Sequence, residues 1–341
     1  MHRAELAKTR LSDVAKLAGV SAATVSRAIN SPEKVSAALR QRVTAAVDQL
    51  HYVPHGAARA LASRRSRTIG AVVPTLDIAI FAAGVAALQN RLHASGYTLL
   101  VANAEYDLAK EAQQVRALLE RGVDGLVLVG GLHLPEVYNL LQKNRVPFVN
   151  TYNFGPEAEH PCIGINHYLA AYRVIEYLLD LGHRRFGMIT SPVRNNDRIK
   201  ARRDGFLDAL RDHDLPLPAA RAFEVPYTIA DGGTALRSLL GIGAGVTAVT
   251  CTADMLAIGA LQECRALGVR VPGEVSVTGF DDLDLAMHLD PPLTTVRIPA
   301  AELGRRAGDY LLARINGRAV PHRVELSAHL IVRGSTGRPG G

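Results

Sequence analysis

The sequence predicts a chain of two parts, a small all-α helix-turn-helix module followed by a larger α/β body. Apolar residues at helical spacing, interrupted by a glycine, predict the helical module within residues 11–30. From residue 68 onward, short apolar runs alternate with amphipathic segments, which is typical of a parallel sheet covered by helices on both faces. With 341 residues, of which 48% are hydrophobic, the chain can bury cores for two or three domains.

Residues 11–30, LSDVAKLAGVSAATVSRAIN, predict two short helices joined by a tight turn. Gly19 suits a left-handed backbone position, Val20 would fill the space between the helices, and Ser21 is placed to cap the second helix. The outer face of that helix carries small, polar and basic side chains that fit a DNA major groove, namely Ser21, Ala22, Ala23, Thr24, Ser26, Arg27 and Asn30. An ordinary helical hairpin with solvated Ser and Thr residues is the alternative.

Basic charge is concentrated at the N-terminal end of the chain. Residues 1–67 contain 12 Lys and Arg against 4 Asp and Glu, a net charge of +8, whereas the rest of the chain carries 27 basic and 28 acidic residues, a net charge of −1. A basic module attached to a nearly neutral body is typical of a protein that places one end on a polyanion. A merely solvated basic face would not be confined in this way.

A third helix, capped by Ser36, is expected to follow the second. Its core stripe would be formed by Val43, Ala46, Val47 and Leu50. Arg40 and Arg42 would point outward to DNA phosphates, which position a protein on the duplex rather than read its sequence. The next segment, HGAARALASRR, is too short to be a stable helix in isolation.

The stretches VAKLAGVSAATVSRAIN and KVSAALRQRVTAAVDQLHYVPHGAARALASRRSRTIGAVVP resemble the DNA-binding segment and hinge of the lactose repressor (LacI) family of bacterial transcriptional regulators. The resemblance implies that residues 55–67 form a hinge that orders on DNA, with Leu61 as an apolar wedge in the minor groove. His55 stands where the family usually has asparagine, and a plain flexible linker is the alternative for this segment. The residues expected to contact DNA are Leu11, Ser12, Ser21, Ala22, Ala23, Thr24, Ser26, Arg27, Asn30, Ser36, His55, Ala58 and Leu61.

Residues 68–332 resemble the effector-binding body of the same family, which is similar to periplasmic sugar-binding proteins. The landmarks are RGVDGLVLVG, LGHRRFGMIT, RRDGF, LGVRVPGEVSVTGFDD and DPPLTTVRIP. The resemblance implies two Rossmann-like lobes that face each other across a ligand cleft, with chain crossings near His167, Arg297 and Ser327. The expected boundaries are 1–54 for the DNA-binding module, 55–67 for the hinge, 68–167 and 297–326 for the N-lobe, 168–296 and 327–332 for the C-lobe, and 333–341 for a flexible tail.

The cleft of such a body binds a small molecule near the carboxyl ends of the strands. Arg202 matches a family arginine that donates to effector oxygens, Asp281 matches a carboxylate that accepts from ligand hydroxyls, and Phe81 is placed to stack on a ligand ring. Arg198 beside Arg202 suggests an anionic ligand, with a solvated Arg198 as the alternative. The expected effector-binding residues are Ile80, Phe81, Tyr152, Arg198, Arg202, Tyr227, Asp254 and Asp281.

Several polar groups that the family often has in this pocket are replaced. The segment before Phe81 lacks the usual asparagine and proline, and other family pairs are replaced by Tyr152-Asn153 and Ala253-Asp254. Because these changes remove hydroxyl-binding groups, a plain hexose is less expected than in the family at large. The expected effector is a sugar-like or an anionic metabolite.

Other functional classes lack their motifs. The glycine cluster at 241–245 lies between a helix and a strand, which is the wrong order for a dinucleotide-binding loop, and the sequence has no P-loop, nucleophile elbow or zinc-protease helix. A dehydrogenase is therefore a distant alternative, and an architectural DNA-binding protein would need no ligand-binding body. Cys162, Cys251 and Cys264 lack disulfide or metal spacing, so we expect buried thiols, no metal and no cofactor.

The expected protein is a cytoplasmic, nucleoid-associated regulator, because the sequence has neither a long apolar run nor the apolar core of a signal peptide. A homodimer would place two recognition helices in successive major grooves of a pseudo-palindromic operator. Its interface should include the helix at residues 81–93, and no C-terminal leucine heptad is present to make a tetramer. Effector binding would shift the lobes and thereby the order of the hinges, with repression as the family default.

Overall fold

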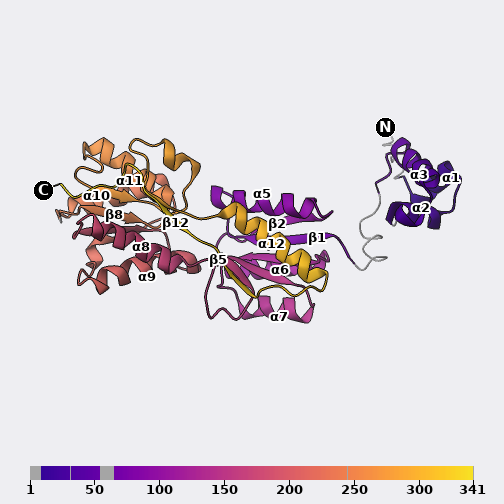
Figure 1. The fold of residues 1–341 in the computed structure, drawn as a ribbon, viewed down its shortest axis with the longest axis horizontal. Coiled ribbons are helices and arrows are strands. Elements are labelled where there is room, and N and C mark those ends of the chain that lie inside the picture. Colours follow the sequence, from indigo (N-terminus) through magenta and orange to yellow (C-terminus); the bar gives the residue numbers. More distant parts are fainter. Residues whose placement is uncertain (1–8, 31, 54–64, 244, 341) are drawn as a thin grey trace, which may run out of the picture. The chain divides into compact units, whose positions relative to one another are not determined.

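The computed structural model describes residues 9–30, 32–53, 65–243 and 245–340. It divides into two compact units, the N-terminal unit of residues 1–67 and the body of residues 68–341. Among the described residues of the N-terminal unit there are three α-helices and one 3-10 turn, namely α1 (Leu11–Ala18), α2 (Ala22–Asn30), η1 (Pro32–Lys34) and α3 (Ala37–Gln49) (Figure 1).

The turn between α1 and α2 follows from its sequence. Gly19 ends α1 with a φ of 62°, a left-handed conformation that glycine adopts without strain. Ser21 Oγ accepts from the backbone N–H of Thr24 at 3.1 Å, and Ser36 Oγ accepts from the N–H of Leu39 at 3.3 Å. Both predicted caps are therefore confirmed, and each satisfies a helix N–H that has no partner within its helix.

The apolar faces of the three helices meet in one small core. Val14 and Val25 are fully buried, Val43 is buried with them, and Val20 packs against this cluster from the turn. Alanines on all three helices fill the remaining space. The predicted helix-turn-helix is thereby confirmed.

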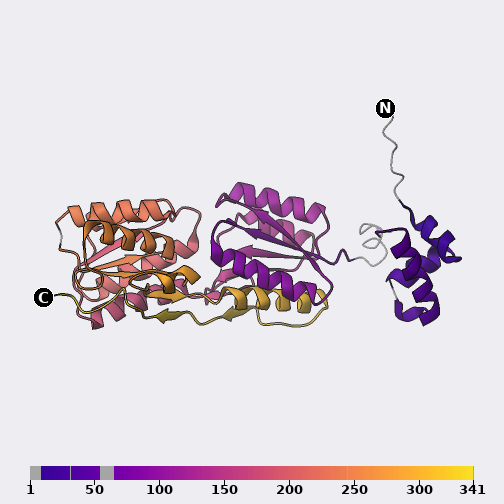
Figure 2. The ribbon, with the colours of Figure 1, turned by 90° about the horizontal axis from the view of Figure 1, so that it is seen from above.

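The body consists of two lobes, each a parallel sheet between two layers of helices (Figures 1 and 2). The N-lobe sheet has the strand order β11-β5-β4-β3-β1-β2. Its strands are β1 (Thr68–Val73), β2 (Thr98–Asn103), β3 (Gly125–Val129), β4 (Phe148–Asn153), β5 (Cys162–Ile165) and β11 (Arg323–Glu325). Its helices are α5 (Ala79–His93), α6 (Leu108–Glu120), α7 (Pro135–Lys143) and α12 (Ala300–Ile315).

Side chains of β1 show how the N-lobe is layered. Ile69 and Val73 join the core under α5 and α12, whereas Val72 faces the opposite core under α6 and α7. Because both faces of the sheet are covered, strands such as β3 are apolar along their whole length. The predicted parallel α/β architecture is confirmed.

The C-lobe repeats this arrangement with the strand order β7-β6-β8-β9. Helices α8 and α9 cover one face and α10 and α11 cover the other. The elements are α8 (His167–Asp180), β6 (Phe186–Thr190), α9 (Asp197–Asp212), η2 (Ala219–Arg221), β7 (Ala222–Glu224), α10 (Ile229–Gly241), β8 (Ala248–Cys251), α11 (Asp254–Leu267), β9 (Ser276–Thr278) and η3 (Asp284–His288).

The chain passes between the lobes three times, after β5, after β10 (Thr295–Arg297) and before β12 (His329–Ile331) (Figure 2). Strands β10 and β12 pair antiparallel as a separate two-stranded sheet. The Asp282 carboxylate accepts from Arg297 Nε at 2.6 Å and from Arg333 Nη2 at 2.7 Å. These contacts tie both crossing segments to the C-lobe.

Residues 333–340 correct the expectation of a loose tail. Ser335 is fully buried, and its Oγ donates to the carbonyl oxygen of Val277 at 2.6 Å. Thr336 Oγ1 lies 2.9 Å from the hydroxyl of Tyr177. The glycine-rich composition suggested mobility, but the hydroxyl side chains within it fix the segment on the edge of the C-lobe sheet.

Two further expectations concern the thiols and the membrane. Cys162, Cys251 and Cys264 are buried and free, as predicted. Over the described ranges, no helix is long and apolar enough to cross a membrane.

Close packing of α5 on α12 gives a test of the fold. A Cβ added at Gly304 would lie 2.0 Å from the backbone oxygen of Gly84, whereas the nearest atoms to one at Gly308 are side-chain atoms, including Arg91 Cγ at 3.0 Å and Leu88 Cδ1 at 3.5 Å. We expect Gly304→Ala to lower the free energy of unfolding by about 2–3 kcal/mol, because the helices must separate. Gly308→Ala is the matched control and should change it by less than about 1 kcal/mol. Urea unfolding measures both, and equal losses would contradict this packing argument.

Candidate functional site

The face of α2 opposite the small core is the candidate DNA-binding surface. Val25 and Ala28 turn inward, whereas Ala22, Ala23 and Arg27 are exposed on the other side. Thr24 and Ser26 are half-buried at the edges of this face, and Ser21 is exposed at the start of the helix. Most side chains on this face are small, so the backbone of α2 can approach a DNA groove closely. Arg27 extends from the same face as a cation.

The remaining predicted DNA contacts are only partly placed. Ser12 is exposed in the first turn of α1, and the exposed Ser36 caps α3. Leu11 is half-buried and packs against the small core, so its side chain is partly used in the fold. The structure does not describe the side chain of Asn30, or residues His55, Ala58 and Leu61.

A cavity between the two lobes of the body, the interlobe cavity, brings together seven of the eight predicted effector-binding residues. They are Ile80, Phe81 and Tyr152 from the N-lobe and Arg198, Arg202, Tyr227 and Asp281 from the C-lobe. The cavity volume is about 30 Å³, whereas ligand cavities commonly measure about 300–1,000 Å³. With the lobes in this arrangement, the cavity is too small for a metabolite.

Arg202 is held on every side in this cavity. Its Nη2 lies 3.0 Å from Asp281 Oδ1, its Nη1 donates to the carbonyl of Thr252 at 2.7 Å, and its guanidinium carbon lies 3.9 Å from the centre of the Phe280 ring. The other carboxylate oxygen of Asp281 accepts from the Tyr227 hydroxyl at 3.3 Å. Burial raises the pKa of Asp281, and the Arg202 guanidinium opposes this shift.

His167 fixes the orientation of Arg202. Its Nδ1 accepts from Arg202 Nε at 3.1 Å, so the ring proton is on Nε2, which donates to the carbonyl of Tyr152 at 2.8 Å. Burial, followed by the charge of Arg202, holds the pKa of His167 well below its ordinary value. The neutral imidazole of His167 therefore connects Arg202 of the C-lobe to the carboxyl end of β4 in the N-lobe.

Arg198 is not solvated, which corrects one of the two sequence interpretations. It is buried, and its Nη1 contacts Asp197 Oδ1 at 2.9 Å and the carbonyl of Val129 at 3.4 Å. Since Arg198 and Arg202 each pair with a carboxylate, the cavity carries little excess positive charge. This pairing weakens the argument for an anionic ligand.

Asp254 is the one predicted effector-binding residue that does not line the cavity. It is fully buried behind it, where Oδ1 accepts from the Thr295 hydroxyl at 2.5 Å and Oδ2 accepts from the N–H of Leu283 at 2.7 Å. Its side chain is therefore used to hold the loop after β9. The family resemblance located the correct region but not the direction of this side chain.

Sequence reasoning missed Tyr106 and Asn196, which both line the cavity. Tyr106 follows β2, and Asn196 precedes α9 and caps it by accepting from the N–H of Ile199 at 3.3 Å. Both lie in segments that follow the carboxyl ends of parallel strands, and this position was a signal available in the sequence.

The buried carboxyl of Asp254 predicts a pH dependence of stability. Burial, followed by repulsion from Asp281, raises its pKa from 3.8 to about 7. Between these values the folded state holds a proton that the unfolded state releases, so this group stabilises the protein at acidic pH and loses its contribution as pH rises through about 7. The free energy of unfolding is measured in urea at about pH 5 and about pH 8. Between these pH values, the wild type should lose about 1 kcal/mol or more of stability relative to Asp254→Asn. A constant difference between the two proteins would contradict the assignment.

Comparison with known proteins finds matches for both parts of the chain, the N-terminal unit and the body. Residues 10–55 match the model for bacterial regulatory proteins of the lacI family, and residues 175–336 match the periplasmic binding protein-like domain. The chain is 34% identical over 328 residues to the HTH-type transcriptional repressor CytR of Escherichia coli K12, covering 96% of both proteins. The chain belongs to the LacI family.

Solved structures of transcriptional regulators have the same fold over nearly the whole chain. The Lac repressor dimer bound to operator and the anti-inducer ONPF matches with a TM-score of 0.86 and 28% identity, covering 96% of this chain and 99% of that one. A complex of the transcriptional regulator CelR with cellobiose matches with a TM-score of 0.70 and 31% identity over the same shares. Members of the LacI family regulate transcription and are not enzymes, so this chain is a transcriptional regulator.

Proposed function

We propose that this LacI-family regulator represses transcription by binding a pseudo-palindromic operator as a homodimer, through the outer face of α2. The exposed small side chains and Arg27 on that face carry the proposal, together with the charge of +8 on residues 1–67. The operator-bound Lac repressor dimer among the structural neighbours supports the dimeric arrangement. Such a protein would act in the cytoplasm, associated with the nucleoid.

The DNA contacts assigned to this function fall into two groups. Ala22, Ala23 and Arg27 would face base edges, whereas Ser12 and Ser36 would face the sugar-phosphate backbone. Leu61, in the hinge, would enter the minor groove between the two half-sites.

The interlobe cavity would bind the effector, with Arg202 donating to it and Asp281 accepting from it. Tyr227 and Tyr106 supply further hydroxyl groups, and Phe81 meets Tyr152 edge-to-face at 5.1 Å as the aromatic wall. Because both arginines of the cavity are paired with carboxylates, a hydroxyl-bearing, sugar-like effector fits this site better than an anion does. The CelR complex with cellobiose supports a ligand of this class.

Coupling between the two sites would follow from the movement of the lobes. A ligand that fits between them changes their separation, and this changes how the hinges of the two protomers meet on DNA. Linkage requires that operator DNA alters effector affinity by the same factor by which effector alters operator affinity. The expected interface of the dimer includes α5, which runs along one face of the N-lobe.

The deciding experiment is fluorescence-polarisation binding to DNA selected from a random palindrome pool. It is repeated over a range of salt concentrations and with a panel of sugars, sugar acids and phosphorylated metabolites. We expect tight, sequence-specific binding that a neutral sugar-like compound shifts. Binding without sequence preference would contradict the operator function, and a response confined to phosphorylated compounds would overturn the effector class.

A further inference from the structure

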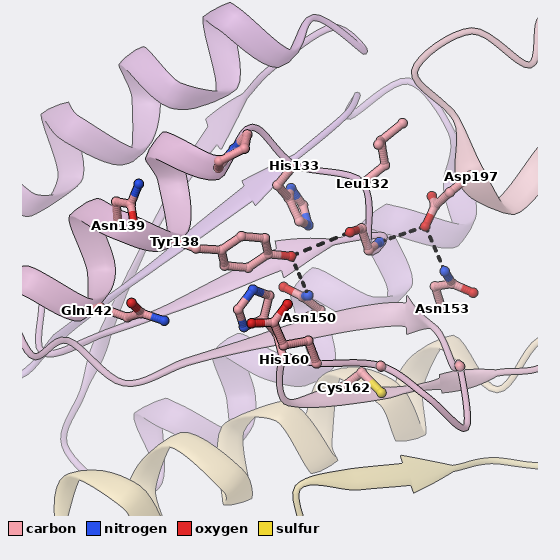
Figure 3. A pocket seen from close by; sticks show the side chains of 15 residues that line it. Leu132, His133, Tyr138, Asn139, Gln142, Asn150, Asn153, His160, Cys162 and Asp197 are labelled. Carbon is pink, nitrogen blue, oxygen red and sulfur yellow. Dashed lines mark hydrogen bonds between the residues drawn. The ribbon is translucent and has the colours of Figure 1, made fainter.

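The N-lobe contains a second, larger pocket that shares no lining residue with the interlobe cavity. It measures about 720 Å³ and lies between α7, strand β4 and the loop that leads from β4 to β5 (Figure 3). We call it the α7 pocket. This volume falls within the usual range of small-molecule sites, about 300–1,000 Å³.

A buried polar group in this pocket lacks a partner. Asn150 of β4 is only 4% exposed, and its Nδ2 donates to the Tyr138 hydroxyl at 2.9 Å. Its Oδ1 has no hydrogen-bond partner among the residues that the structure describes. Figure 3 shows the Asn150 side chain in the pocket beside Tyr138 and His160. An unpaired buried acceptor is costly, and a ligand with a donor group would remove that cost.

The other walls define the chemistry of the ligand. None of the lining residues, all of which the structure describes, is Lys or Arg, and two of them, Glu159 and Asp197, carry carboxylates, so the pocket disfavours a phosphate or carboxylate. Carboxamides of Asn139, Gln142 and Asn153 can both donate and accept. The rings of Tyr138 and His160 lie against each other with their centres 3.6 Å apart, tilted by 33°, and form an aromatic wall. Burial lowers the pKa of His160, so this wall is neutral at physiological pH.

One lining residue comes from the other lobe. Asp197 of α9 accepts at Oδ2 from the N–H of Gly131 and from Asn153 Nδ2, both at 2.7 Å (Figure 3). Its Oδ1 holds Arg198, which lines the interlobe cavity. The pocket therefore has its complete wall only when the lobes are together, and Asp197 lies between the two cavities.

We propose that the α7 pocket is a second ligand site, which takes a neutral ring compound of monosaccharide or nucleoside size with a hydroxyl or N–H donor directed at Asn150 Oδ1. Since Asp197 belongs to its wall, a ligand in this site favours the closed arrangement of the lobes. The effect on operator binding rests on the proposed function, whereas the binding itself does not.

Isothermal titration of the full-length protein tests the site. The probes are glucose, ribose, adenosine and uridine, together with their phosphorylated counterparts. Gln142→Trp fills the pocket from α7, and Lys143→Trp is the matched control, because Lys143 is the next residue on the same helix but does not line the pocket. Asn150→Leu removes the unpaired acceptor, and thermal melting checks that each variant folds.

We expect at least one neutral probe to bind, with an affinity that falls about tenfold or more in Gln142→Trp and in Asn150→Leu. Lys143→Trp should leave this affinity unchanged. A sugar and a nucleoside that both bind would identify the shared hydroxyl-bearing ring as the recognised group. The proposal is wrong if every observed event survives Gln142→Trp, if no neutral probe binds, or if the phosphorylated counterparts bind this site more tightly. Because no DNA is present, the result is independent of operator recognition.

Discussion

Replacing Arg27 with alanine is expected to abolish sequence-specific operator binding. Arg27 is the one basic side chain on α2, and it is exposed on the face opposite the small core. An arginine that reads guanine in the major groove contributes about 1–3 kcal/mol of discrimination. A homodimer loses this contribution twice, so we expect the operator affinity to fall about 100-fold or more in fluorescence polarisation at moderate salt.

Two further changes separate base reading from phosphate contact. Arg40→Ala, on the exposed side of α3, should weaken binding to all sequences alike and reduce its salt dependence. Larger side chains at Ala22 and Ala23 should change which operator is selected without lowering the overall affinity for DNA. If Arg27→Ala merely weakened all DNA equally, Arg27 would be a phosphate contact and the assigned recognition face would be wrong.

The three helices within residues 9–53 could be predicted because their signals are local. Gly19, Ser21 and Ser36 act within one helical turn of their own positions, and the spacing of the apolar residues sets the helices around them. The alternation of strands and helices fixed the class of the body for the same reason. Within 54–64, which the structure does not describe, the hinge contacts of His55, Ala58 and Leu61 stay predictions.

The errors concern side chains whose environment is made by distant segments. Arg198 lines the cavity as predicted, but the alternative of a solvated side chain was wrong, because Val129 of the other lobe lies against it and a single helix sequence cannot show this. Asp254 turns toward Thr295, 41 residues away, and not into the cavity. Ser335 is buried by β9, although its glycine-rich surroundings suggested a mobile tail. The unpaired acceptor of Asn150 likewise becomes visible only when α7 and β4 are packed together.

Removing the carboxylate of Asp281 is the substitution in the body with the largest expected effect. Asp281→Ala leaves the guanidinium of Arg202, which is 5% exposed, without its ion-pair partner at 3.0 Å. Breaking a buried pair from one side costs about 3–5 kcal/mol, because the remaining charge stays buried. Urea unfolding of the full-length protein measures this loss. The control is Asp204→Ala, which breaks partly exposed pairs with Lys200 and Arg203 and should cost less than Asp281→Ala, about 1 kcal/mol.

The double variant Arg202→Met/Asp281→Leu distinguishes the structural role of this pair from its role in binding effector. Replacing both charges with apolar side chains of similar size should recover part of the stability that Asp281→Ala loses, because no buried charge is left unpaired. It should not recover all of it, because the Thr252 carbonyl, His167 Nδ1 and the Tyr227 hydroxyl lose their partners. The effector response of operator binding should not recover, because the donor and the acceptor for the ligand are both gone. A double variant that is stable and still responds to effector would show that the pair only holds the lobes. Recovery of stability without the response would assign effector recognition to Arg202 and Asp281.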